Sequence, residues 1–252
     1  MTSPKNATTT KSGRTYTWGN ESFVSVTTLL GALSKPAIIR WAAKSVAEYA
    51  VTHMAEIHAL ALADPDGAIR ALKGSPWQVR DKAADFGTHV HKQIEARLLG
   101  QTPAEPPADV ATRVGYFQQW ADDYLPDFEA AEATVYNRAD HYAGTLDIIA
   151  TIGGKRYIVD VKTGKSGVFP EMALQLAAYA NAEFIGAPDG TEIVMPEIEA
   201  GAVLWIGPNG YEFVGVRIDD VIYESFLDVA NSWNFQNVIG KSAILGQIEV
   251  PS

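Results

Sequence analysis

Two predicted neighbouring strands carry charged residues where a packed strand would favour valine. The stretch GTLDIIATIGGKRYIVDVKTG, residues 144–164, has the pattern of two apolar strands joined by a tight turn. Asp147 lies in the first strand, and Asp160 and Lys162 lie in the second. Alternate residues of a strand share a face, so Asp160 and Lys162 point the same way. Charges in such apolar runs are costly unless they have partners.

A divalent cation would be one such partner. Two carboxylates that converge at one edge of a sheet repel each other, and a bound cation removes that repulsion. Oxygen-rich ligands suit Mg²⁺ or Mn²⁺, and a lysine beside the cation can hold a water molecule or a phosphate. These groups together are what hydrolysis of a phosphodiester requires. The alternatives are an exposed salt bridge for Asp160 and Lys162, and an edge-strand position for Asp147.

Helical segments supply further candidates. Gln175 and Tyr179 are four residues apart in QLAAY and therefore share one face of a predicted helix. In FGTHVHKQIE, His91 and Glu95 share a face, and His89 lies nearly opposite His91. Each of these residues taken alone is typical of an ordinary helix position. Glu132, in EATVYN, reads as an edge-strand charge and is not selected as a site residue.

Composition narrows the class of protein. Nearly half of the 252 residues are hydrophobic, which is enough for a core, and no cysteine is present. The lack of cysteine excludes disulfides, zinc–thiolate sites and iron–sulfur clusters, and it fits a reducing cytoplasm. No apolar run is long enough to span a bilayer. The net charge of −10 disfavours non-specific binding of nucleic acid, so such a role would need a local positive patch or bound cations.

The order of predicted elements indicates one domain. We expect a flexible tail over residues 1–14 and a single domain over 15–252. Within it, we expect a helical part over about 25–125 and a sheet-containing core over about 127–235. One helix is expected to begin at Ser75 and Pro76, and another to end at Gly186. The pattern predicts an α+β fold, with a mixed central sheet covered by helices.

Four motifs occur in the order GTHVH, GTLD, DVKTG and QLAAY. This combination resembles the RecB-like branch of the PD-(D/E)XK nucleases, which includes CRISPR-associated and phage-encoded exonucleases and the mitochondrial genome maintenance exonuclease. The resemblance covers about residues 16–218, including SFVSVTTLLGALSKPAIIRW near the start, but only the motif positions are specific. It implies a restriction-endonuclease-like sheet with a helical N-terminal extension. The matching positions are Gly87, His91, Asp147, Asp160, Lys162, Gln175 and Tyr179.

The resemblance also implies a role for each position. Metal binding would fall to His91, Asp147, Asp160 and the carbonyl of Val161. Lys162 would orient or activate the attacking water, and Gln175 and Tyr179 would position Lys162 or the scissile phosphate. The Gly-x-x-x-His spacing favours His91 over His89 as the ligand. Many RecB-like exonucleases carry four cysteines that bind an iron–sulfur cluster, so this chain resembles the members without one.

Three residues are further candidates for contact with substrate: Lys165, Arg138 and His89. Lys165 follows the second strand directly in KTGKSG, whereas a solvated turn is the alternative for such basic residues.

The expected function is a DNA exonuclease that depends on Mg²⁺ or Mn²⁺. It would be of phage type, act in recombination, replication or DNA processing, and work in the host cytoplasm. A phage recombination protein or a single-strand-binding protein is a candidate partner. The alternatives are a structure-specific (flap) endonuclease of the same fold and a catalytically silent module that binds DNA or protein. No Walker motif is present, so ATP hydrolysis is not expected.

Overall fold

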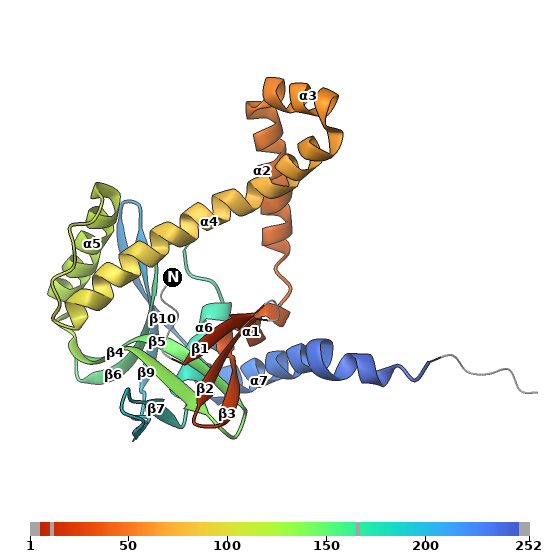
Figure 1. Cartoon of the computed structure of the whole chain (residues 1–252). Helices are drawn as coiled ribbons and strands as arrows, with labels where there is room; N and C mark the ends of the chain where they lie inside the picture. Colours follow the sequence, from red (N-terminus) through yellow and green to blue (C-terminus); the bar gives the residue numbers. More distant parts are fainter. Residues whose placement is uncertain (1–5, 11–12, 165–166, 247–252) are drawn as a thin grey trace, which may run out of the picture. The chain divides into compact units, whose positions relative to one another are not determined.

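The structure is a computed structural model that describes residues 6–10, 13–164 and 167–246. It divides into two compact units: Met1–Leu33 with Val90–Ser252, and Ser34–His89. The second unit is helical and contains α2 (Pro36–Thr52), α3 (Met54–Ala63) and most of α4 (Pro65–Leu98) (Figure 1). Lys165 lies outside the described residues.

The first unit holds a mixed sheet and the helices that cover it. The strands are β1 (Ala7–Thr10), β2 (Gly13–Trp18), β3 (Glu21–Ser25), β4 (Asp127–Asn137), β5 (Tyr142–Ile152), β6 (Lys155–Lys162), β7 (Phe184–Gly186), β8 (Glu192–Val194), β9 (Ala200–Gly207) and β10 (Gly210–Val216). The α-helices are α1 (Val26–Leu29), the end of α4, α5 (Ala108–Tyr124), α6 (Glu171–Ala180) and α7 (Asp220–Asn234). Three short helical turns cover Leu30–Ala32, Phe235–Ile239 and Gly240–Ala243. The predicted mixed sheet flanked by helices is confirmed.

Strand β5 is the centre of the sheet because it is the strand at which the sheet branches. One edge of β5 pairs antiparallel with β4 over nearly its whole length. The other edge pairs first with β3, at Tyr142 and Ala143, and then with β6 from Ile148 to Ile152. Between these partners, residues 144–147 have no strand neighbour on that edge within the described residues. This gap coincides with the GTLD motif.

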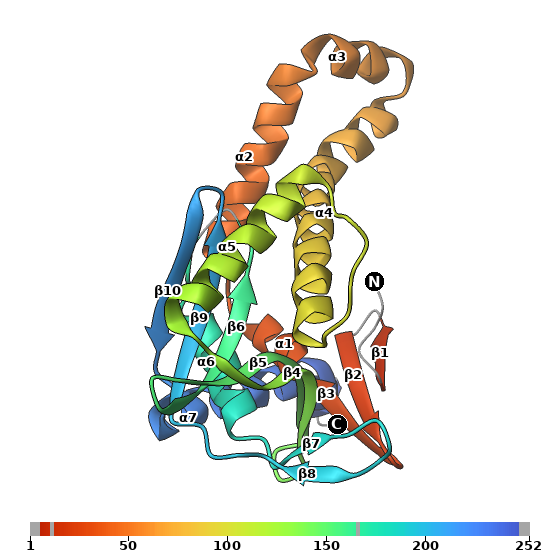
Figure 2. The ribbon, with the colours of Figure 1, turned by 90° about the vertical axis from the view of Figure 1, so that its left-hand side faces the viewer.

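The core fixes the strands around this gap. Leu146, Ile149 and Ile158 of β5 and β6 are fully buried and pack in one cluster with Leu176 of α6 and Phe226 of α7. Each such side chain contributes roughly 1.5–3 kcal/mol when it leaves water. Helix α5 lies beside the β9–β10 hairpin (Figure 2), where the fully buried Trp120 packs on Phe213. In the described residues, no helix combines the length and the apolar character needed to cross a membrane.

The predicted helix start at Ser75 and Pro76 is wrong, because α4 begins at Pro65 and runs through Pro76. A proline inside a helix removes the hydrogen bond to the carbonyl four residues earlier, here that of Leu72. The Ser75 hydroxyl donates to the Leu72 carbonyl oxygen at 2.9 Å and satisfies this acceptor. Ser75 is therefore part of a continuous helix and does not cap a new one.

The predicted helix end at Gly186 is also wrong, because α6 ends at Ala180. Phe184 and Ile185 pair with β4 instead, opposite Tyr136 and Val135. Their apolar side chains continue the helical pattern in the sequence, but β-pairing with a distant strand decides their conformation. At the N-terminus, Ala7–Thr10 form β1, antiparallel to β2, within the segment assigned to a tail.

Gly144 allows helix α6 to approach β5 closely. A Cβ atom at this position would lie 2.3 Å from Cε1 of Tyr179, whose side chain is buried. We expect Gly144→Ala to lower the free energy of unfolding by about 1–3 kcal/mol, because the buried ring of Tyr179 would have to shift to make room for the methyl group. Urea denaturation would measure this change. Gly215→Ala is the matched control, since a Cβ at this other strand glycine meets nothing within 4 Å. Equal effects of the two substitutions would contradict the close approach.

Candidate active site

Three carboxylates form a row across three neighbouring strands. The register that pairs Ala131 with Ile148 and Ala133 with Leu146 sets Glu132 of β4 opposite Asp147 of β5. The antiparallel pairing of β5 and β6 ends at Ile148 and Val159, so the next opposed positions are Asp147 and Asp160. Directly opposed residues of antiparallel strands share a face of the sheet. Register therefore places Glu132, Asp147 and Asp160 at the same level of three neighbouring strands.

Asp147 lies where β5 and β6 separate. Its Oδ2 atom accepts a hydrogen bond of 2.7 Å from the backbone N–H of Val161. The side chain thereby takes the place of a strand carbonyl, because the backbone pairing of β5 with β6 has already ended. The same oxygen lies 3.9 Å from Nδ1 of His91, near the end of α4. About 17% of the Asp147 side chain is exposed, so the carboxylate remains reachable from solvent.

Asp160 is the most deeply buried of the three acids, with 2% of the residue exposed. Its Oδ1 atom accepts hydrogen bonds from Nζ of Lys162, at 2.7 Å, and from Nε2 of Gln175, at 3.0 Å. Nζ of Lys162 is also 2.6 Å from Oδ2, but Oδ2 accepts no hydrogen bond of acceptable geometry within the described residues. The charge of Lys162 compensates this oxygen, which still has a lone pair that a further donor or a cation could use.

Burial and neighbouring charges shift the pKa values of Asp160 and Lys162. Burial raises the pKa of Asp160, and the nearby carboxylate of Asp147 raises it further. Burial alone would lower the pKa of Lys162, but the carboxylates of Asp160 and Asp147 outweigh that effect and raise it. Lys162 is therefore an ammonium group at neutral pH, and about a third of its side chain remains exposed.

Tyr179 supports the site from within the core. It is 3% exposed, and burial raises the pKa of its hydroxyl well above the ordinary value. Its ring lies against Gly144, and Gln175, one helical turn earlier, donates to Asp160. The structure thus brings Gln175 and Tyr179 of α6 to the acids, with Gln175 bound to Asp160 and Tyr179 closed off from solvent.

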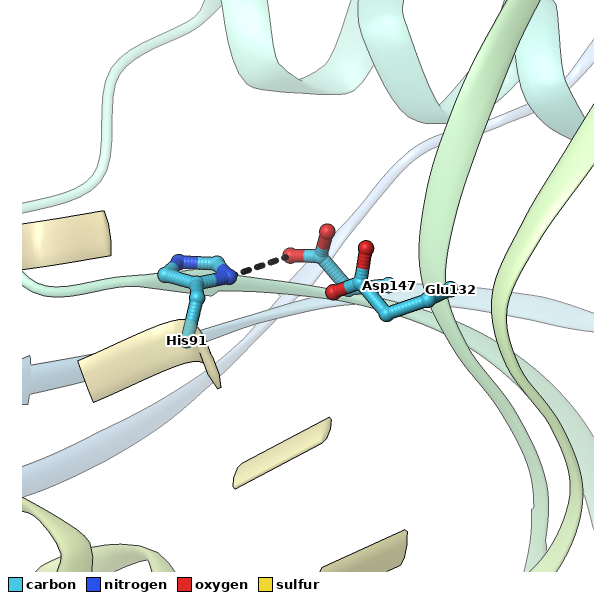
Figure 3. A group of neighbouring side chains, drawn as sticks. All are labelled: His91, Glu132 and Asp147. Atoms are coloured by element: carbon cyan, nitrogen blue, oxygen red, sulfur yellow. Dashed lines mark ion pairs between the residues drawn. The ribbon is translucent and has the colours of Figure 1, made fainter. Parts of the chain in front are cut away.

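The sequence suggested that Glu132 is a charged residue of an edge strand, but in the structure it lies beside His91 and Asp147. Ligand atoms of His91, Glu132 and Asp147 all lie within 4.8 Å of one another, and the three side chains point toward one another (Figure 3). Burial raises the pKa of Glu132 from 4.5 to about 8, and the charges of Asp147, Glu95 and Asp160 add to this effect. No sequence motif marks Glu132, and only its register opposite Asp147 identifies it.

The residues present fit a hard divalent cation. His91, Glu132 and Asp147 offer one imidazole nitrogen and carboxylate oxygens, and Asp160 adds a buried oxygen that lacks a hydrogen bond. Carboxylate oxygens with a histidine suit Mn²⁺, and the carboxylates suit Mg²⁺. Burial is the main cause of the raised pKa of Glu132, and the repulsion by neighbouring acids that adds to it is what a cation would remove.

Two of the residues expected to contact substrate, Arg138 and His89, lie outside the group of acids. The Arg138 guanidinium donates to the carboxylates of Glu21 and Glu192 and lies over the ring of Phe184. Arg138 follows the far end of β4, roughly 15–20 Å along the strand from Glu132. Arg138 therefore forms ion pairs with carboxylates of the protein and lies far from Glu132, Asp147 and Asp160. His89 is exposed.

No model of a known protein family and no curated protein matches the chain. Among solved structures, one titled "Crystal structure of SSO0001" is similar at 15% sequence identity and a TM-score of 0.31. The similarity covers 60% of this chain and 71% of that one. A likeness at this level supports no functional conclusion.

The raised pKa of Glu132 predicts how stability depends on pH when chelator is present. In the unfolded chain this carboxyl titrates near 4.5, and in the folded protein near 8, so folding takes up a proton between these values. The free energy of unfolding should therefore fall as the pH rises through this window. Glu132→Gln removes the titrating group and should flatten the fall, as measured by urea denaturation in EDTA at about pH 5, 7 and 9.

Glu224→Gln is the control for that measurement, because Glu224 is an exposed residue of α7. Its pH dependence should match that of the unsubstituted protein. A Glu132→Gln protein with the same fall as the unsubstituted protein would show that Glu132 is not held among like charges.

Proposed function

We propose that this protein is a metal-dependent nuclease that hydrolyses phosphodiester bonds of DNA. The observation that carries the proposal is the convergence of Asp147, Asp160 and Lys162 where β5 and β6 separate, with His91 beside them. These four positions match motifs of the RecB-like nucleases, in the same order along the chain. We further propose that it is a phage-type exonuclease acting in recombination, replication or DNA processing.

The chain's own groups suit this chemistry. His91, Asp147 and Asp160 would hold Mg²⁺ or Mn²⁺, and the bound cation would neutralise phosphate charge and lower the pKa of a coordinated water. Lys162 remains protonated and part-exposed, so its ammonium group can donate to the attacking water or to a phosphate oxygen. Gln175 holds the Asp160 carboxylate and thereby helps to fix the position of Lys162. This rigidity favours one geometry for attack.

The charge of the protein supports dependence on a cation. The chain has a net charge of −10, and three acidic side chains line the site, of which Glu132 is mostly protonated at neutral pH when no cation is bound. A DNA phosphate would be repelled by this row unless a cation lies between them. Binding of substrate at the site and its hydrolysis should therefore both require the cation.

The first test is digestion of end-labelled linear DNA and of a covalently closed circle, with Mg²⁺, Mn²⁺ or EDTA. We expect loss of the linear DNA with either metal, none with EDTA, and an intact circle. Lys162→Ala should lower the rate by about 100-fold or more, because it removes a donor aimed at developing charge. Asp147→Asn should abolish cutting, because it weakens the cation site.

Lys155→Ala is the matched control, because Lys155 is an exposed lysine at the opposite end of the same strand. It should leave the rate unchanged. Cutting of the circle would identify an endonuclease instead. Binding of DNA without any cutting in either metal would contradict nuclease activity and identify a binding module.

A further inference from the structure

Glu132 has a backbone conformation that a glutamate rarely adopts in a strand. Its φ angle is +49°, in the left-handed region, whereas neighbouring residues of β4 remain paired with β5. Non-glycine residues persist in this region where the surrounding structure fixes them, and such residues cluster at functional sites. The pairs on either side of Glu132, at Ala131 and Ala133, hold it in place. Its side chain is therefore directed by the sheet, beside that of Asp147.

In the part of the chain that the structure describes, no lysine or arginine side chain compensates the Glu132 carboxylate. Within the described residues, neither a hydrogen bond nor an ion pair from a cationic side chain reaches it, and it is half-buried. The charged groups around it are the carboxylates of Asp147, Glu95 and Asp160, together with the His91 imidazole, whose nearest nitrogen lies within 4.8 Å. A carboxylate in such surroundings gains from a cation more than one with a bound lysine, as Asp160 has.

We propose that Glu132 is a direct ligand of the divalent cation, together with His91 and Asp147. No motif of the sequence specifies this position, and the inference rests on the proposed function for the presence of a cation. The three side chains come from α4, β4 and β5, and their ligand atoms lie within 4.8 Å of one another (Figure 3). A cation at their centre would lie within reach of all three with small side-chain movements.

Asp160 and Glu132 would then have different tasks. Asp160 is bound by Lys162 and Gln175 and buried, so it anchors the lysine as well as adding charge at one side of the cation. Glu132 also borders a cavity of about 620 Å³ together with Glu95, Thr134 and Thr145. A cation bound by Glu132 could keep some of its water on this side, as Mg²⁺ and Mn²⁺ commonly do in proteins.

Binding of Mn²⁺ tests this inference without any use of enzyme activity. The free ion has a six-line electron paramagnetic resonance signal that is lost on binding, so titration of the whole protein gives the dissociation constant. Loss of even an outer-shell partner of a metal ligand weakens binding about 10- to 100-fold. We therefore expect Glu132→Gln to raise the dissociation constant at least about tenfold. Glu132→Asp keeps the charge but shortens the side chain, and it should also weaken binding.

Asp127→Asn is the control, because Asp127 is an exposed acid at the start of the same strand. It should leave Mn²⁺ affinity unchanged. Thermal unfolding in EDTA checks that each variant is folded, and Glu132→Gln should be at least as stable as the unsubstituted protein. Unchanged Mn²⁺ affinity in a folded Glu132→Gln protein would overturn the inference.

The outcomes also separate this inference from the proposed function. If Asp147→Asn loses Mn²⁺ while Glu132→Gln binds it normally, the cation site stands and only the role of Glu132 falls. If Glu132→Gln loses Mn²⁺ but the unsubstituted protein cuts no DNA, the ligand is established and the nuclease function falls. If the unsubstituted protein binds no Mn²⁺ at all, both are overturned.

Discussion

Crowding of three acidic side chains on adjacent strands is the constraint on which the rest of the site depends. Register brings Glu132, Asp147 and Asp160 to the same level of β4, β5 and β6, where Glu132 is buried beside other acids and keeps its proton to a higher pH. The protein offsets part of this cost with specific donors: the Val161 N–H for Asp147, and Lys162 and Gln175 for Asp160. Glu132 receives no such donor among the described residues, and burial among like charges raises its pKa to about 8. The uncompensated part of the cost is what a cation would relieve.

The branching of the sheet at β5 makes this arrangement possible. A strand paired along both edges would leave no room for a side chain to replace a backbone acceptor. Here β3 leaves β5 after Ala143 and β6 joins it only at Ile148. Asp147 uses the end of that gap to accept from Val161, and Gly144 at its beginning lets Tyr179 approach. The buried cluster around Leu146 and Ile158 keeps the strands fixed, so the polar groups are positioned by a rigid scaffold.

The acids differ in environment, and that difference divides their tasks. Asp160 is buried and binds the part-exposed Lys162, so the protonated amine is held at a defined point beside the acids. Asp147 accepts a hydrogen bond from the Val161 N–H and is partly exposed to solvent. Glu132 borders the cavity. The row therefore runs from the buried Asp160 to Glu132, which borders the cavity.

The sequence alone determined the hairpin of β5 and β6 and the order of its motifs, because alternation and turn residues act over a few positions. It also indicated Asp147, Asp160, Lys162, Gln175 and His91, which the structure brings together. Contacts between distant segments decided the rest. Pairing with β4 made Phe184–Gly186 a strand, and the Ser75 hydroxyl on the Leu72 carbonyl carried α4 through Pro76. Glu132 could not be recognised from its own neighbourhood, because its partner Asp147 is fixed by strand register, a property of two segments and not of one.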